Sequence, residues 1–330
     1  PSTAAATTTS VPDPWDAVTA ERVSADGSAM RQVLDTFPLF TGALVLGLDG
    51  AKQPIVATIA DHGWTEEPAP LPAAAASQQV LGGAVWTQGQ DHFVALTVWQ
   101  PPYNDSTMST HVYERTADGW SESAGFPGLV DDAATNGSEV VLVGRFNGPT
   151  IWSTAGSGGW TLKWHQDELL VAALAGVATD GAGFVAVGSR GELDGLVVQS
   201  EDGEQWRASP VGIACWMPGS VTYGPAGYVM VGEPADVPSL RVVDGEIQGE
   251  GRMTEVSGNC GGGRVVSFCG SYFAAVGSRR IRSTDGLTWT AVRLDVATPL
   301  GWDVAEDGEL VAIGSDGAHV VVTYFGCPLP

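Results

Sequence analysis

Arginine side chains recur just after apolar segments of this chain that end in glycine. Arg145 follows Gly144 directly, and Arg190 and Arg279 each stand two residues after such a glycine. A guanidinium group binds carboxylate or sulfate through paired, charge-assisted hydrogen bonds. If the fold brings the three segments together, these arginines could hold an anionic group. The alternative is that they are solvated loop residues that pair with nearby acids such as Asp194.

Aromatic side chains occupy segments that would share a face with those arginines. Tyr103 belongs to a polar insert that follows the apolar segment 93–97, and Trp216 and Trp302 lie between successive apolar segments. An aromatic ring can stack on a sugar or a peptide, or it can pack between neighbouring parts of the fold. The sequence leaves both roles open for these residues.

Catalytic residues are harder to assign. Asp131, Asp132, Asp303 or Glu306 could supply the two carboxylates that glycoside hydrolysis needs. The histidines form no HxH or HxxxH pair, so we predict no metal site, and no cofactor is expected. The chain has no nucleophile elbow of the Gly-x-Ser-x-Gly type. We therefore assign no catalytic residue and keep a glycoside hydrolase or lyase as the alternative to a binding protein.

Seven copies of a short apolar segment must position these side chains. Six copies end in glycine and the second ends in Thr97, with successive ends 37 to 50 residues apart, as in 188 − 144 = 44. Short apolar segments with turn signals and no helical periodicity indicate propeller blades of about four strands. The sequence predicts an all-β, seven-bladed β-propeller with four-stranded blades. The copies cover residues 43–47, 93–97, 140–144, 184–188, 228–232, 273–277 and 310–314.

A second repeated feature is a turn followed by tryptophan, best seen at residues 283–289. Asp285 can accept backbone N–H bonds and Gly286 can adopt positive φ, so the pair indicates a hairpin tip. Trp289 would then lie on the returning strand and cover a hydrophobic layer. Imperfect copies of this turn-plus-tryptophan feature end at Trp64, Trp120, Trp160 and Trp206.

The two ends of the chain are predicted to meet in one blade. No such hairpin follows the last apolar copy, whereas residues 12–18 near the N-terminus contain a spare tryptophan, Trp15. We expect this segment to be the outer strand of the last blade, which would leave no exposed sheet edge. Residues 11–330 then form one domain, and the Ala/Thr/Ser-rich residues 1–10 are a disordered tether.

Composition favours an exported protein. The net charge is −23 and only two of the basic residues are lysines, which disfavours nucleic acid and anionic membranes as partners. No stretch has the ~20 apolar residues of a transmembrane helix. The tether is what remains when an export signal is removed, by a signal peptidase or at a lipidated cysteine just upstream. We expect a secreted or surface-attached protein.

The four cysteines fit two disulfides. Cys215 and Cys260 each stand 17 residues before the glycine of their copy, since 232 − 215 = 17 and 277 − 260 = 17, so they would meet on adjacent blades. Cys269 and Cys327 are predicted to end strands on the same edge of the ring and to form the second pair. The alternative is four buried free thiols.

Residues 283–289 resemble the Asp-box (BNR repeat) of sialidase-like β-propellers, of the form S-x-D-x-G-x-x-W, with one residue fewer between Asp and Gly. The resemblance implies six to eight blades. Asp-boxes occur in sialidases, other glycoside hydrolases, sorting receptors and photosystem assembly factors, on the face opposite the usual binding site, so they select no function. The F/Y-R-I-P motif of sialidases is absent from residues 30–35, and the alternation around Tyr324 fits packing better than a nucleophile.

These observations give one functional hypothesis and two alternatives. We expect a propeller that binds a carbohydrate or a cell-envelope protein, without catalysis, through one face of the ring. The alternatives are a glycoside hydrolase or lyase, and a structural subunit of a cell-envelope assembly. The expected binding residues are Tyr103, Arg145, Arg190, Trp216, Arg279 and Trp302.

Overall fold

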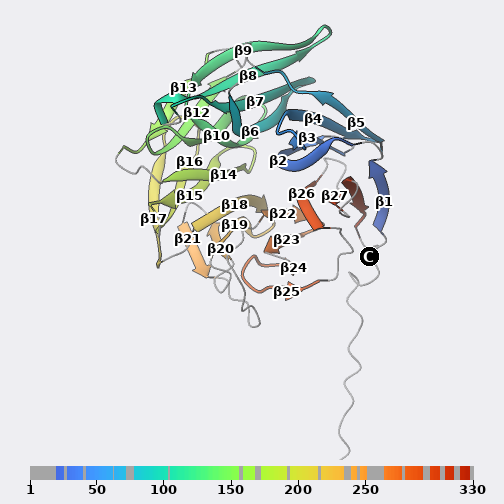
Figure 1. The fold of residues 1–330 in the computed structure, drawn as a ribbon. Coiled ribbons are helices and arrows are strands. Elements are labelled where there is room, and N and C mark those ends of the chain that lie inside the picture. Colours follow the sequence, from blue (N-terminus) through green and yellow to red (C-terminus); the bar gives the residue numbers. More distant parts are fainter. Residues whose placement is uncertain are drawn as a thin grey trace, which may run out of the picture.

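The computed structural model shows seven four-stranded antiparallel sheets arranged in a ring (Figure 1). It confirms the predicted seven-bladed β-propeller. The structure describes residues 20–327 except 26–27, 40–41, 62, 72–77, 103–104, 156–158, 168–171, 192–193, 215–216, 234–238, 244–245, 251–263, 277–278, 293–297, 305–308 and 316–319. No helix in the described part of the chain is long and apolar enough to cross a membrane.

Blades 1 to 6 each consist of four consecutive strands, from the inner strand at the channel to the outer strand. The first three blades are β2 (Met30–Leu39), β3 (Gly42–Asp49), β4 (Pro54–Ala60) and β5 (Gly63–Pro68); β6 (Gln79–Gln88), β7 (Asp91–Trp99), β8 (Met108–Thr116) and β9 (Gly119–Pro127); and β10 (Leu129–Thr135), β11 (Glu139–Arg145), β12 (Pro149–Ala155) and β13 (Thr161–His165). A short 3-10 helix, η3 (Asp105–Thr107), precedes β8.

The later blades follow the same plan. They are β14 (Ala173–Thr179), β15 (Phe184–Arg190), β16 (Asp194–Ser200) and β17 (Arg207–Ala214); β18 (Met217–Gly224), β19 (Gly227–Glu233), β20 (Ser239–Val243) and β21 (Glu246–Glu250); and β22 (Arg264–Phe268), β23 (Ser271–Val276), β24 (Arg279–Ser283) and β25 (Thr290–Ala291). Blade 7 consists of β26 (Thr298–Val304), β27 (Leu310–Ser315), β28 (Val320–Phe325) and β1 (Ala20–Ala25).

The repeated apolar segments are the second strands of the blades, and the structure explains their terminal glycine. A Cβ atom on Gly144 would lie 1.9 Å from the carbonyl oxygen of Leu129, and one on Gly188 would lie 2.0 Å from that of Ala173. In both blades the inner strand has a β-bulge next to this glycine, which brings its backbone unusually close. In blade 2 the corresponding residue is Val98 rather than Thr97, because Val98 pairs just before the bulge.

The turn-plus-tryptophan segments form the hairpins between third and fourth strands. Asp285 Oδ1 accepts the backbone N–H groups of Leu287 and Thr288 at 2.9 and 2.7 Å, and Gly286 has a φ of 75°. Trp289 is buried and donates its Nε1–H to Ser239 Oγ in blade 5 at 2.8 Å. The hairpin of blade 6 therefore also links two blades.

Apolar side chains fill every junction between neighbouring blades in the described part of the ring. Most of the residues come from the first three strands of each blade, and alternate residues of one strand face the same junction. Tyr324 is 4% exposed and belongs to the cluster between blades 7 and 1. The side chain of Tyr324 therefore packs in the core, as the alternation of the sequence around it predicts.

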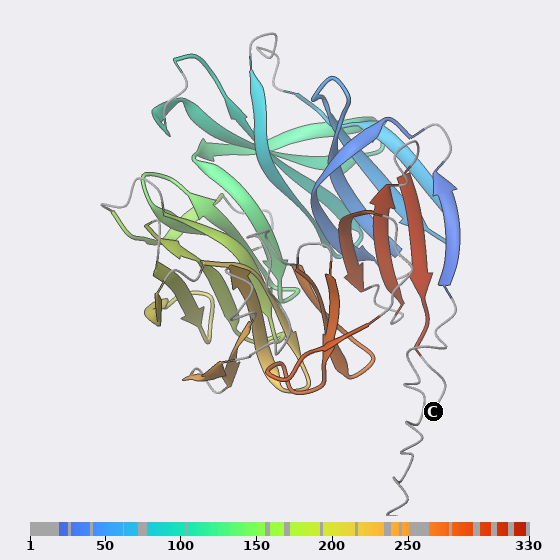
Figure 2. The ribbon, with the colours of Figure 1, turned by 60° about the horizontal axis from the view of Figure 1, so that its bottom comes forward.

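The N-terminal strand closes the last blade, as predicted, but the segment was predicted wrongly. Strand β1 pairs antiparallel with β28, with Ala20 opposite Phe325 (Figure 2). The prediction used Trp15 as the marker of an outer strand, whereas Ala20–Ala25 contains no aromatic residue. Residues 1–10 and 12–18 lie outside the described residues.

A disulfide joins Cys269 to Cys327, with 5.7 Å between the Cα atoms. Cys269 lies in the turn after β22, and Cys327 follows β28, so the bond links blade 6 to blade 7. It confirms one of the two predicted pairs. Cys215 and Cys260 lie outside the described residues.

Candidate functional site: the central channel

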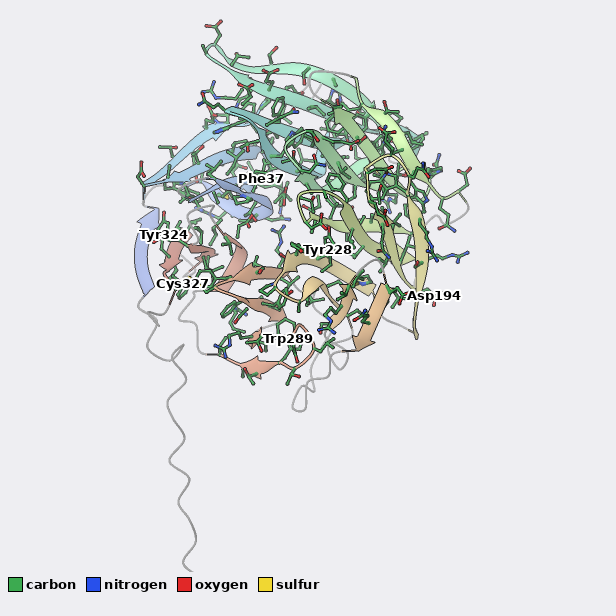
Figure 3. All side chains as sticks on the ribbon, turned by 180° about the vertical axis from the view of Figure 1, so that it is seen from behind. Phe37, Asp194, Tyr228, Trp289, Tyr324 and Cys327 are labelled. Carbon is green, nitrogen blue, oxygen red and sulfur yellow. A yellow bond between two sulfur atoms is a disulfide. The ribbon has the colours of Figure 1, made fainter. Side chains whose placement is uncertain are left out.

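The predicted binding residues are only partly placed. Arg145 ends β11 and is partly buried, with Nη2 3.9 Å from Met108 Sδ. Arg190 is exposed and lies opposite Asp194 in the register of β15 with β16. Figure 3 labels Asp194, which lies near the edge of the molecule in that view. Only the backbone is described for Arg279 in β24 and Trp302 in β26, and Tyr103 and Trp216 lie outside the described residues. Of the three arginines, the structure describes the side chains of Arg145 and Arg190.

A cavity of ≈ 290 Å³ occupies the channel between the inner strands. Its lining includes residues between Asp131 and Thr135 of β10 and between Ala175 and Thr179 of β14. The neutral part of the lining is made mainly of small and aliphatic side chains and of threonine. The charged residues that line it are Asp35, Asp131, Asp132, Arg264 and Asp303.

A bulge in β10 places two consecutive aspartates in this lining. Val130 pairs with Gly144 and Asp132 pairs with Val143, so Asp131 is the extra residue of the bulge. In a regular strand, neighbouring side chains point to opposite faces. The bulge re-aims one of them, and as a result both Asp131 and Asp132 face the cavity.

Three of the carboxylates hold the inner strands in place. Asp132 accepts the backbone N–H groups of Ala133 at 2.9 Å and of Val177, in blade 4, at 2.8 Å. Asp303 accepts the N–H of Val304 at 2.8 Å. Similarly, Asp35 is 3% exposed and accepts the N–H of Val85, in blade 2, at 3.0 Å. These acids therefore have structural partners.

Arg264 crosses from blade 6 to blade 1. Its Nη1 donates to Thr36 Oγ1 at 3.1 Å, and its Nη2 donates to the carbonyl oxygen of Leu34 at 3.0 Å and lies 3.8 Å from Asp35 Oδ1. Strand β26 of blade 7 lies between the inner strands of these two blades. The guanidinium group of Arg264 thus links blade 6 to blade 1 across the inner strand of blade 7.

Asp131 differs from the other three acids, because no hydrogen bond joins its carboxylate to another residue of the described structure. Its Oδ1 lies next to Gly82 of blade 2: a Cβ atom added to this glycine would be 3.5 Å from the oxygen. Burial raises the pKa of Asp131 to about 7. The positive charge of Arg145 lowers this pKa, and the negative charge of Asp132 raises it further. Asp131 is thus the acid in the lining that is most available to a ligand.

Burial also raises the pKa of the other carboxyls. The pKa of Asp303 is about 7 and that of Asp132 about 6, in both cases despite backbone hydrogen bonds and the charge of Arg264. The pKa of Asp35 is raised by burial and by Asp132. These carboxyls therefore retain protons near neutral pH, since Arg264 is the one arginine of the described lining and ionising every carboxyl there would leave uncompensated charge.

Asp303→Asn is expected to flatten the pH dependence of stability. The folded carboxyl keeps its proton up to a pKa of about 7, whereas an unfolded aspartic acid loses it near pH 4. Between these values the folded state binds more protons, so this contribution is complete below about pH 4 and is lost as pH rises to 7. The free energy of unfolding of the variant should therefore fall less steeply between pH 4 and pH 7, by up to about 1.4 kcal/mol per pH unit.

Urea unfolding of both proteins between pH 5 and pH 8 measures this effect, and the Asp303→Asn protein should be the more stable of the two at pH 8. The half-buried His92, whose pKa is lowered mainly by burial, changes stability in the opposite direction but equally in both proteins. The exposed hairpin variant Asp118→Asn is the control. Parallel profiles for wild type and Asp303→Asn would contradict the assignment.

Sequence reasoning found this site only in part. Asp131, Asp132 and Asp303 were considered as carboxylates for hydrolysis, whereas Asp35 and Arg264 were not singled out. The sequence could have indicated both residues, because each lies in an inner strand a few residues before an apolar second strand. Among the residues that the structure describes, no three His, Cys, Asp or Glu side chains gather closely enough to hold a metal ion.

The likeness to known proteins lies in the fold. No protein-family model and no curated protein matches the chain. Among solved structures, YCF48 bound to D1 peptide is similar, with a TM-score of 0.62 and 15% identity over 93% of this chain and 97% of the other. Virginiamycin B lyase from Staphylococcus aureus has a TM-score of 0.65 at 12% identity, over 93% and 99%. The WD40 β-propeller domain of Doa1 has a TM-score of 0.59 at 9% identity, over 92% and 95%. The chain therefore shares the β-propeller fold with proteins of different functions.

Proposed function

We propose that the protein binds a segment of a partner protein at the central channel, without catalysis, and anchors it by a lysine or arginine side chain. The observation that carries the proposal is the cavity of ≈ 290 Å³ in which Asp131 has no hydrogen bond to a described residue. The described lining has four aspartates against Arg264 alone. A cation placed there would offset the charge that burial makes costly.

The fold is compatible with such a role. The similar structure of YCF48 is a complex with a D1 peptide, so a propeller of this size is able to bind a peptide. The proposal takes a cationic anchor because the charged groups in the described cavity lining are mainly acidic, and neither Arg145 nor Arg190 is among them. It retains a protein partner, and we further propose that the protein is exported and that its turn-plus-tryptophan hairpins are Asp-boxes.

Selection from a random peptide library tests the proposal. Peptides that bind the intact protein should be enriched in lysine or arginine, and Asp131→Asn should weaken their binding about tenfold, the value of one charge-assisted hydrogen bond. Asp118→Asn removes an equal charge from an exposed hairpin tip and should leave affinity unchanged. Enrichment of acidic peptides, or equal binding to the Asp131→Asn protein, would refute the cation-binding role.

A glycoside hydrolase or lyase remains the second candidate, because the raised pKa values of Asp131 and Asp303 suit a general acid. Hydrolysis would need a second carboxylate free to act, and those of Asp35, Asp132 and Asp303 already accept backbone N–H groups. A glycan array read for both binding and cleavage distinguishes the candidates. It also tests carbohydrate as the ligand in place of a peptide.

A further inference from the structure

A chain of hydrogen bonds joins a serine, a histidine and a glutamate in blade 2, away from the channel. Ser109 Oγ lies 3.1 Å from His111 Nε2, and His111 Nδ1 lies 2.8 Å from Glu122 Oε1. Ser109 and His111 are two residues apart on β8, so their side chains share one face of the strand. Glu122 comes from the adjacent strand β9. The hairpin thus adds Glu122 to two groups that are already neighbours on β8.

The direction of the hydrogen bonds follows from the chemistry of the three groups. An ionised carboxylate only accepts, so His111 must carry its proton on Nδ1, the atom that faces Glu122. Nε2 then has a free lone pair and accepts the hydroxyl proton of Ser109. A serine bound to an imidazole that a carboxylate orients is the arrangement that activates a nucleophile, and it is recognised by geometry rather than by sequence order.

The group is accessible at the junction of blades 1 and 2. Tyr113 and Arg115 continue the same face of β8; Tyr113 is buried between the two blades, and Arg115 forms an ion pair with Glu67 of blade 1 at 2.9 Å. Nearer the start of the strand, Ser109 is only partly buried, and the side chain of His111 is 21% exposed. A small substrate can therefore reach the hydroxyl.

Blade 3 contains a similar chain that serves as a natural comparison. Thr150 Oγ1 lies 3.1 Å from His165 Nδ1, and His165 Nε2 lies 2.7 Å from Asp167. However, Thr150 is fully buried, and its hydroxyl also contacts the carbonyl oxygen of Gly148 at 2.8 Å. This chain is closed to a substrate, whereas the one in blade 2 is open.

We propose that Ser109 is a nucleophile towards small carboxylic esters, with His111 as its base and Glu122 as the positioning residue. Ser109 Oγ adds to the ester carbonyl carbon while its proton moves to His111 Nε2. The alcohol leaves with that proton, and an acyl group remains on Ser109. Water, deprotonated by His111, then releases the carboxylic acid and restores the serine. The activity is independent of ligand binding at the channel.

A fluorophosphonate probe tests the proposal on the intact protein, since it forms a stable Ser–O–P bond with loss of fluoride. We expect covalent labelling at Ser109, mapped by peptide mass spectrometry, and none at Thr150. His111→Ala should slow labelling about 100-fold, the usual contribution of a general base. Glu122→Gln should slow it about tenfold or more, because an amide can donate to Nδ1 and favour the wrong tautomer.

Two controls separate chemistry from folding. Ser123→Ala removes the hydroxyl of an exposed serine of the same hairpin that donates to the carbonyl oxygen of Val112, and labelling should be unchanged. Thermal unfolding of each variant verifies that the blade is intact. Absence of labelling at Ser109 would overturn the proposal, as would labelling that is equally fast in the folded His111→Ala protein.

Discussion

Replacing Cys269 and Cys327 together by serine is expected to lower the free energy of unfolding by about 4 kcal/mol, the chain-entropy value for a loop of this length. The disulfide closes a loop with a sequence separation of 58, and its loss frees the unfolded chain. Cys327 is exposed and Cys269 is partly buried, so the serine side chains themselves should add little. Denaturant unfolding without reductant gives the difference.

Reduced wild-type protein provides the matched comparison for this variant. In reductant, its free energy of unfolding should equal that of the double-serine variant measured in the same reductant, because reductant opens any other disulfide equally in both proteins. A difference below about 1 kcal/mol between oxidised wild type and the variant would show that the bond does not stabilise the closed ring.

Gly144→Ala is expected to cost about 3 kcal/mol, the upper part of the range for overpacking a core. The new methyl group would lie 1.9 Å from the carbonyl oxygen of Leu129. That oxygen belongs to the inner strand of the same blade, so it can move only if the pairing of β10 with β11 shifts. Equilibrium unfolding in urea measures the cost.

Gly159→Ala in the same blade is the control, because no described residue beyond its chain neighbours has an atom within 4 Å of the added Cβ. It should unfold within about 0.5 kcal/mol of wild type. Equal stability of the two alanine variants would mean that the repeated glycine reflects something other than the close approach of the bulged strand.

The fold was predictable because each blade repeats the same local signals. An apolar second strand, a glycine against the bulge and a hairpin tip each follow from a few neighbouring residues, such as Gly188 or Asp285. The first strand, Ala20–Ala25, was misplaced because it lacks the tryptophan that lies in or just before five of the other six outer strands. Its pairing with β28 is set by closure of the ring, which no local pattern encodes.

The channel was less predictable because its contacts join distant residues. Arg264 bonds to Leu34 and Thr36, which are 230 and 228 positions away, and nothing near residue 264 indicates this. The bulge that turns Asp131 toward the cavity is likewise a property of paired strands. Ser109, His111 and Glu122 were missed because Glu122 joins the other two only across a hairpin, and the three residues match no known motif spacing.

The pairing of β1 with β28 has a consequence for how the protein is made. Residues 20–25 can pair only after residues 320–325 have been synthesised, so the ring cannot close before that point. Contacts this far apart in sequence form slowly. Until then the nascent protein presents two open sheet edges that could pair with another copy, which places a demand on chaperones late in synthesis.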